Sequence, residues 1–212
     1  MAASIIDSSI FQGIFTTDAM REVWSDENRT RKYIDVERAL AIVQGRLGLI
    51  PQDAADEIVS HCHLEQIDMA RLRQQTERIG YPILGVVTQI NQLCRDKLGE
   101  YVHWGATTQD ITDTATVLQI REALQLVDDE LAAIAAAMAK LANEHRLTPI
   151  IGRSNLQQAI PVTFGYKMAG LLSAVLRHRE RLAQREDRVL VGQYAGAAGT
   201  PTSLEARATE TQ

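Results

Sequence analysis

The chain has 212 residues, of which 45% are hydrophobic and 23% charged, and these ordinary globular proportions exclude disorder over most of its length. The formal net charge is −5 and the sequence contains no basic stripe, so we expect no nucleic-acid partner. Only 13 glycines and 5 prolines are present, which favours long helices and an all-α fold over a β-sandwich.

Cellular location and cofactors are constrained by what the sequence lacks. Cys62 and Cys94 are far apart and form no C-x-x-C pair, so neither a disulfide framework nor a zinc site is indicated. No uncharged apolar stretch approaches the roughly 18 residues of a membrane span, and residues 1–17 lack the pattern of a signal peptide. We therefore expect a soluble, cytoplasmic protein without membrane contact, metal or other cofactor.

The first 110 residues read as a small helical domain. Ser25 is a good N-cap for a helix that runs to Gly48, with an apolar stripe at Val36, Leu40, Val43 and Leu47. Three shorter helices are predicted over Pro51–Cys62, Glu65–Ile79 and Pro82–Leu98. We therefore predict an N-terminal helical domain over residues 1–110.

Two longer helices are predicted in residues 111–212. No glycine or proline interrupts residues 111–145, and the apolar positions alternate by three and four residues in a heptad seam: Val117, Ile120, Leu124, Val127, Leu131, Ile134, Met138 and Leu141. A second helix starts near Pro161 and repeats this spacing at Phe164, Met168, Leu171, Val175, His178 and Leu182. Two such helices cannot cover each other fully. We expect them to be the first helices of an incomplete central bundle, completed by helices from the rest of a longer chain or from other subunits of a homo-oligomer.

Three polar segments rich in small residues interrupt the helical pattern, at residues 101–110, 152–161 and 192–200. The first two directly precede the long helices, whose exposed N–H groups and dipole can bind a carboxylate or phosphate. Thr107 and Thr108 would add hydroxyl donors there, and Gly105 allows close approach of the backbone. In the alternative interpretation, Thr107, Thr108 and Asp110 only cap the helix.

Together the three segments resemble the fumarase/aspartase superfamily. Residues 103–114 match its run H-x-G-x-[TS]-[ST]-x-D-x-x-D-T, residues 152–165 match G-R-T-H-x-x-x-A-x-P-x-T-x-G, and residues 196–200 match the Gly-Ala-rich element that follows. The order and spacing agree as well. The residues of these motifs are most similar to those of the branch that contains 3-carboxy-cis,cis-muconate cycloisomerase and adenylosuccinate lyase.

The resemblance implies a function as well as a fold. It implies a cytoplasmic homotetrameric lyase or cycloisomerase that performs anti β-elimination, or its reverse, on a dicarboxylate such as carboxymuconate or a succinyl-amine compound. It assigns substrate binding to Thr107, Thr108, Gln109 and Arg153. It assigns catalytic positions to His103, Ser154, Asn155 and Gln158, whereas Asp113 and Thr114 are implied to be structural.

Two departures from the family pattern limit this assignment. Asn155 and Gln158 stand where the family often has a histidine, and neither side chain is a useful acid. The family's Gly-Ser-Ser-x-Met-Pro loop, which carries the base serine, does not occur in these 212 residues. We therefore expect the N-terminal portion of such an enzyme, inactive on its own. The alternatives are a catalytically silent helical oligomerisation module and an unrelated helical bundle.

The substrate is only weakly constrained. Residues 14–31 contain Arg21, Arg29 and Arg31 but no Arg-Tyr pair of the kind that holds a nucleotide phosphate in adenylosuccinate lyases. This slightly favours a smaller acid, such as a carboxymuconate or a succinyl compound.

Overall fold

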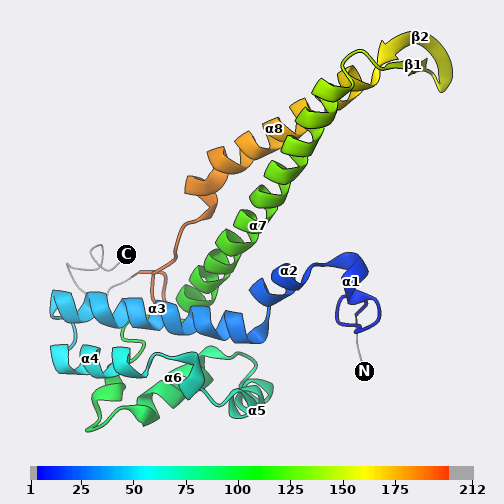
Figure 1. Cartoon of the computed structure of the whole chain (residues 1–212). Helices are drawn as coiled ribbons and strands as arrows, with labels where there is room; N and C mark the ends of the chain where they lie inside the picture. The colour runs from blue at the N-terminus through cyan, green and yellow to red at the C-terminus, as the bar shows by residue number, and fades with distance from the viewer. Residues whose placement is uncertain (1–3, 201–212) are drawn as a thin grey trace. The chain divides into compact units, whose positions relative to one another are not determined.

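The computed structural model describes residues 4–200, and these confirm an all-α fold interrupted by one short hairpin (Figure 1). The helices are α1 (Gln12–Phe15), α2 (Asp18–Val23), α3 (Asp26–Leu47), α4 (Gln52–His61), η1 (Leu64–Gln66), α5 (Met69–Ile79), α6 (Ile83–Leu93), η2 (Leu98–Tyr101), α7 (Thr108–Glu144) and α8 (Phe164–Val189). The strands are β1 (Pro149–Ser154) and β2 (Gln157–Thr163). The described residues form two compact units: unit 2 is Glu122–Val189, and unit 1 is the rest.

The core of unit 1 forms around α3, whose predicted ends are confirmed. The Ser25 hydroxyl accepts a hydrogen bond from the backbone N–H of Asn28 at 3.1 Å, and Gly48 ends the helix with a left-handed φ of 65°. Such a φ is available to glycine without strain. The largest fully buried apolar side chains come from α3, α4, α6 and the start of α7: Ile34, Ile58, Ile83, Val86, Ile90 and Ile111. This core fixes the start of α7 against α3.

Two of the predicted short helices have different bounds in the structure. The helix predicted from Glu65 begins at Met69, because the Asp68 carboxylate caps it by accepting from the Arg71 N–H at 3.0 Å. The helix predicted to reach Leu98 ends at Leu93, where the chain turns extended, and Asp96 and Lys97 then take positive φ values. A run of non-helical backbone angles cannot continue the α-helical hydrogen bonds.

Unit 2 contains most of α7, the hairpin and α8. The hairpin was not predicted: Pro161, expected near a helix start, pairs with Ile151 in the antiparallel ladder, and α8 begins three residues later at Phe164. Gly165 lies so close to α7 that an added Cβ would be 2.4 Å from the Ala142 carbonyl oxygen. Further along α8, Arg179 donates two hydrogen bonds of 2.8 Å to the Asp128 carboxylate. These contacts hold α8 against α7.

The compact units do not coincide with the predicted boundary at residue 110. The first turns of α7 belong to unit 1, because the buried side chain of Gln119 donates to the Val23 carbonyl at 2.7 Å. The segment after α8 also returns to unit 1. As a description of domains, the division into residues 1–110 and 111–212 stays a prediction, and its last twelve residues lie outside the described part of the chain.

The predicted heptad seam is only partly covered within unit 2. Val127 is 39% exposed, Ile134 42% and Leu171 45%. Among the described residues of this unit only Ala135 and Gly165 are buried. The two helices therefore leave much of their apolar surface without a partner, as the heptad pattern had led us to expect.

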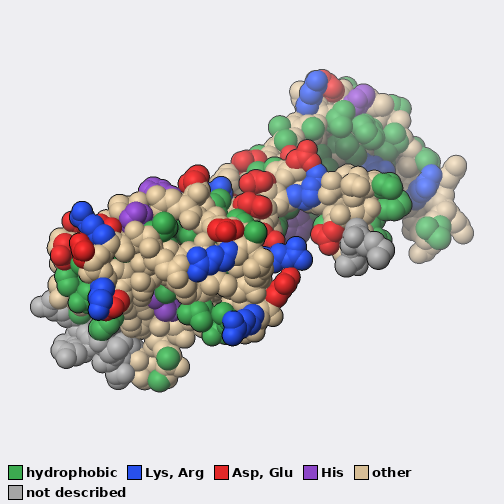
Figure 2. All heavy atoms as spheres, turned by 90° about the horizontal axis from the view of Figure 1, so that it is seen from below, with side chains coloured by type: hydrophobic (Ala, Val, Ile, Leu, Met, Phe, Trp, Pro, Cys, Tyr) green, Lys and Arg blue, Asp and Glu red, His purple; other side chains and the backbone are tan. Residues whose placement is uncertain are grey.

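The charged surface agrees with the sequence. Figure 2 shows basic and acidic side chains interspersed over the visible face, with no broad region of a single sign. In the described part of the chain, no helix combines the length and apolar character that crossing a membrane requires.

Candidate functional site

The predicted site residue His103 lies in a tight turn between η2 and α7. Its backbone φ is 64°, a left-handed value that is costly for a residue other than glycine. The turn is closed by a hydrogen bond of 3.2 Å from the Ala106 N–H to the His103 carbonyl. The imidazole Nδ1 lies 2.6 Å from Oε1 of Glu37, which comes from the middle of α3. A strained turn thus directs the ring toward a carboxylate of another helix.

The electrostatic surroundings favour the protonated form of His103. Burial alone would lower the pKa of the imidazole, but the hydrogen bond and charge of Glu37, with a further contribution from Asp110, raise this pKa above its ordinary value. The His103 side chain is 20% exposed and that of Glu37 is 1% exposed. Among the described residues Nε2 of His103 has no hydrogen-bond partner, so this atom is open to a ligand.

Asp110 is the central anchor of this region. Its carboxylate is buried and accepts three backbone hydrogen bonds, each 3.0 Å long, from Thr107, Ala195 and Gly196. Asp110 is the third residue of α7, and an acidic side chain there can bind the N–H of the residue that precedes the helix. The same carboxylate therefore caps α7 and holds the segment that returns from α8.

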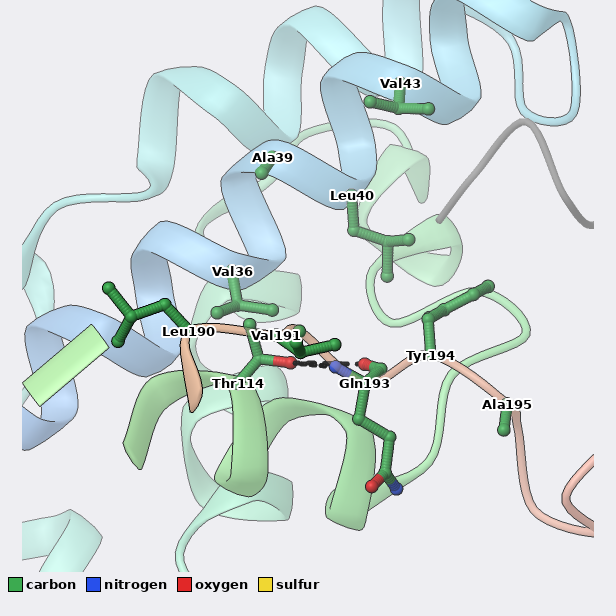
Figure 3. A pocket seen from close by; sticks show the side chains of 11 residues that line it. Val36, Ala39, Leu40, Val43, Thr114, Leu190, Val191, Gln193, Tyr194 and Ala195 are labelled. Carbon is green, nitrogen blue, oxygen red and sulfur yellow. Dashed lines mark hydrogen bonds between the residues drawn. The ribbon is translucent and has the colours of Figure 1, made fainter. Parts of the chain in front are cut away.

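The returning segment is rich in small residues because it packs closely on the His103 turn. Gly196 has a φ of 68°, and an added Cβ would lie 3.1 Å from the carbonyl oxygen of Gly105. Close by, the Thr114 hydroxyl donates to the Gln193 carbonyl at 3.1 Å and accepts from the Gln193 N–H at 3.0 Å, as Figure 3 shows. This supports the predicted structural role of Thr114.

The pocket in Figure 3 lies between α3, Thr114 and the returning segment, and its chemistry is not that of an anion site. No charged side chain lines it; the lining residues are Val36, Ala39, Leu40, Val43, Thr114, Leu190, Val191, Gly192, Gln193, Tyr194 and Ala195. A carboxylate would lose its hydration there without gaining a charged partner. The candidate anion site is therefore the polar turn at the start of α7.

A second buried polar group from α3 fixes that turn. The Gln44 amide donates to the Trp104 carbonyl at 2.7 Å and to the Tyr194 hydroxyl at 3.4 Å, and the same hydroxyl donates to that carbonyl at 3.3 Å. Burial raises the pKa of Tyr194 to about 12, and the charges of Asp110 and Glu37 act in the same direction. Tyr194 therefore stays a neutral donor at physiological pH.

Sequence reasoning missed Glu37, Gln44 and Tyr194, and it considered Asp110 only as a cap. A signal for two of them was present. Glu37 and Gln44 are seven residues apart on α3 and lie on one helix face beside the apolar stripe. Two buried polar residues at that spacing indicate polar partners from elsewhere in the chain.

Thr107 and Thr108 lie where the sequence placed them, at the start of α7. Within the described residues neither hydroxyl takes part in a hydrogen bond, and both side chains are half-buried. The carboxylate of Asp110, rather than a threonine hydroxyl, performs the capping. Gln109 is exposed and donates to Asp113 at 2.6 Å, one turn further along α7. The two threonine hydroxyls therefore remain available as donors beside the helix N-terminus.

The other predicted site residues lie in unit 2, around the turn of the hairpin: Arg153, Ser154, Asn155 and Gln158. Arg153 pairs with Gln158 across the ladder, so their side chains share one face. Asn155 and Leu156 form the two-residue turn with φ values of 48° and 64°, the pattern of a type I′ turn. The structure thus gathers these four residues on one exposed hairpin end, and the other four around the start of α7 in unit 1.

Metal binding finds no support in this arrangement. In the part of the chain that the structure describes, no three His, Cys, Asp or Glu side chains are placed together so that they could hold a metal ion. Burial and the charge of Glu37 raise the pKa of Cys62 to about 12, so its thiol stays protonated.

Comparison with known proteins shows that this chain is similar to enzymes whose names state an activity. Residues 13–212 match the family described as "Lyase". The chain is 55% identical over 191 residues to trans-aconitate decarboxylase 1 of Mycosarcoma maydis, covering 90% of this chain and 39% of that protein. It is 41% identical over 204 residues to N-acetyl-S-(2-succino)cysteine lyase of Dickeya dadantii, covering 96% and 45%.

A solved structure gives the same result for the fold. The 3-carboxy-cis,cis-muconate lactonizing enzyme of Pseudomonas putida superposes with a TM-score of 0.91 at 37% identity, covering 96% of this chain and 47% of that one. The chain therefore spans less than half the length of each of these relatives.

Proposed function

Because this chain belongs to the lyase family, within the fumarase/aspartase superfamily, we propose that it supplies part of the active site of a lyase or cycloisomerase. The reaction is anti β-elimination, or its reverse, on a small acid with at least two carboxylates. The observation that carries this proposal is the start of α7, where two unbonded threonine hydroxyls lie in the same short segment as His103, whose pKa is raised by its hydrogen bond to Glu37.

The chemistry of such a reaction fits this set of donors. Removal of a proton alpha to a carboxylate places additional negative charge on that carboxylate, and preorganised donors stabilise the charge as it develops. The N–H groups and dipole of α7, the hydroxyls of Thr107 and Thr108, and the imidazolium of His103 all favour an anion. The same charge state makes His103 a poor base, so the proton must be removed by another group.

The names of the relatives support a small polycarboxylic acid as substrate. Trans-aconitate, a succinyl thioether and a carboxymuconate are named in the three relatives. The exposed hairpin residues Arg153, Ser154, Asn155 and Gln158 are proposed as further site residues, with Arg153 as a positive charge that can bind a carboxylate. The proposed assembly is a cytoplasmic homotetramer without a metal.

The test of this proposal is a spectrophotometric screen of the protein encoded by the complete reading frame. Carboxymuconate, trans-aconitate, argininosuccinate, adenylosuccinate, and fumarate with ammonia would be offered in turn. Turnover of at least one of these acids, or formation of one from its products, is expected. Activity with none of them would favour the second candidate, a silent oligomerisation module, which the uncovered apolar seam of unit 2 also fits.

The anion site predicts a clear effect of Thr108→Val. The substitution keeps the shape of the side chain but removes its hydroxyl donor. In the protein encoded by the complete reading frame we therefore expect KM for the acid to rise about tenfold, the loss of one hydrogen bond to a charged group. The melting temperature should change by no more than a few degrees, because the capping contact comes from Asp110. Thr112→Val is the matched control, since among residues 4–200 the Thr112 hydroxyl bonds only to backbone carbonyls of α7. A large loss of stability with unchanged KM would favour the capping role.

The uncovered seam predicts self-association. Val127, Ile134 and Leu171 are each at least 39% exposed, and a surface of this kind is rarely left in contact with water. We expect light scattering at micromolar concentration to give a mass several times that of one chain, with a tetramer as the proposed state. Replacing Ile134 by Glu should reduce that mass, whereas a monomeric wild-type chain would contradict the proposal.

A further inference from the structure

We propose that Glu37 is a positioning residue that holds His103 as an imidazolium, with Nδ1–H bound to its carboxylate and Nε2–H free to donate to a carboxylate of the substrate. This assignment rests on the proposed function for the identity of the ligand. It goes beyond that function in naming which residue sets the charge, ring orientation and role of His103.

The contact between His103 and Glu37 is short and its geometry is fixed. The separation of 2.6 Å between Nδ1 and Oε1 is short for a nitrogen–oxygen hydrogen bond, as expected when both groups are charged. The turn that presents His103 is held from both sides, by the Ala106 N–H on its carbonyl and by Gln44 on the next carbonyl, that of Trp104. The ring is therefore fixed with Nδ1 toward α3, and Nε2 is the remaining ring nitrogen.

The Glu37 carboxylate is buried and therefore needs a positive partner. Its side chain is 1% exposed, and among the described residues its second oxygen, Oε2, is buried without a hydrogen-bond partner. A buried carboxylate is stable only with a compensating cation. His103 is the group that contacts it, so a neutral His103 would leave a buried negative charge uncompensated. The fold therefore stabilises the cationic form.

The other groups near the pair do not supply that cation. From α7 comes the carboxylate of Asp110, from the returning segment the phenol of Tyr194, and from the end of α4 the neutral thiol of Cys62. On α3 itself, the guanidinium of Arg38 donates to His63 at 3.4 Å. Asp110 adds to the effect of Glu37 and, like it, raises the pKa of His103.

The charge state decides what His103 does. As an imidazolium it donates a charge-assisted hydrogen bond from Nε2 and cannot remove a proton. In a neutral ring with Nδ1–H held by Glu37, Nε2 would instead be an acceptor and repel a carboxylate. Anion binding should therefore weaken as pH rises through the raised pKa of His103.

The test compares wild type with Glu37→Gln in the 212-residue chain. The glutamine can still accept from Nδ1–H, so it preserves the tautomer while removing the charge. Nuclear magnetic resonance titration of labelled histidine, with the His103 signal identified by its loss in His103→Asn, should give a lower midpoint in the variant than in wild type. The control Glu65→Gln removes one negative charge from an exposed position and should leave that midpoint unchanged.

Binding of the inert probe tricarballylate, measured by calorimetry, gives a second readout. At pH 7.5 we expect affinity to fall about tenfold in Glu37→Gln, the loss of one charge-assisted bond, and the difference to become smaller at pH 5.5, because a lower pH favours the imidazolium in both proteins. Removal of a negative charge would by itself strengthen anion binding, so weaker binding specifically supports the positioning role. An affinity difference that is equal at both pH values would overturn it.

Stability gives a readout that needs no ligand. A folded-state pKa above the unfolded value means that the pair contributes fully below about pH 6.5 and loses its contribution as pH rises through the folded pKa. The unfolding free-energy difference between wild type and Glu37→Gln should therefore shrink from pH 6 to pH 9. A purely structural glutamate would give a constant difference.

These readouts separate the two proposals. Should Glu37→Gln fail to fold, the wild-type titration alone decides: a His103 midpoint at or below its ordinary value overturns the assignment, and a raised one supports it. Failure of tricarballylate to bind wild type, with the midpoint still lowered in Glu37→Gln, would count against the proposed function and support the pairing.

Discussion

Replacing Asp110 with alanine should lower the free energy of unfolding of the chain by about 3 kcal/mol or more. The carboxylate is buried and accepts from three backbone N–H groups, those of Thr107, Ala195 and Gly196. Each buried donor left without a partner costs about 1–3 kcal/mol, and water reaches these half-buried groups only in part. Urea denaturation measures the loss. Amide exchange should quicken specifically at Ala195 and Gly196.

Two further variants separate the hydrogen bonds from simple packing. Asp110→Asn keeps the shape but turns an amide N–H₂ toward backbone donors, so it should cost nearly as much as alanine. Asp113→Ala is the matched control one turn along α7, because within the described part of the chain Asp113 accepts from Gln109 alone. It should cost less than about 1 kcal/mol. Equal losses for Asp110→Ala and Asp113→Ala would refute the anchoring role of Asp110.

Residues 1–212 alone should turn over none of the screened acids at a measurable rate. In the proposed site these residues bind and polarise a polycarboxylate, but the raised pKa of His103 makes it a poor base, and neither Asn155 nor Gln158 can transfer a proton. Loss of a general base typically lowers the rate about 10²–10⁴-fold, and loss of positioning adds to this. The measurement is the absorbance assay on the purified chain, repeated after adding a separately expressed polypeptide that carries a Gly-Ser-Ser-x-Met-Pro loop.

The added polypeptide should restore activity if the two parts assemble. The control is the same mixture with the loop serines replaced by alanine, which should remain inactive. Clear turnover by residues 1–212 alone, abolished by His103→Ala, would show that the base lies within this chain. Both the role of the missing loop and the assignment of His103 as a donor would then be wrong.

The helices could be predicted from local signals because caps and periodicity act over a few residues. The hydroxyl of Ser25 and the left-handed Gly48 bound α3 in the structure as they do in the sequence pattern. The unbroken heptad seam correctly indicated α7, although a few residues at each end differ. The hairpin was missed because a turn through Asn155 and Leu156 requires two consecutive positive φ values, and Leu rarely adopts them.

The site could be predicted only in part, for a different reason. His103 and the two threonines belong to one short motif, so the resemblance found them together. Glu37 lies 66 positions away from its partner His103 and reads in the sequence as one more polar residue of an amphipathic helix. Asp110 was visible as a possible cap, but its contact with residues 195–196 depends on the chain returning from α8. A local pattern such as the spacing of Glu37 and Gln44 can indicate that polar partners exist, but it does not identify those partners.

The exposed hairpin end has a consequence for how this protein can change over generations. Every side chain from Arg153 to Ile160 is exposed and outside any core, so most substitutions there should alter stability by less than about 0.5 kcal/mol. Substitutions can therefore accumulate at this end during evolution without loss of the fold. Insertion of a single residue is different: it would reverse which side chains share a face beyond the turn, and separate Gln158 from Arg153. We expect natural variants to conserve the length of this end and to exchange residues there mainly outside the proposed site residues Arg153, Ser154, Asn155 and Gln158.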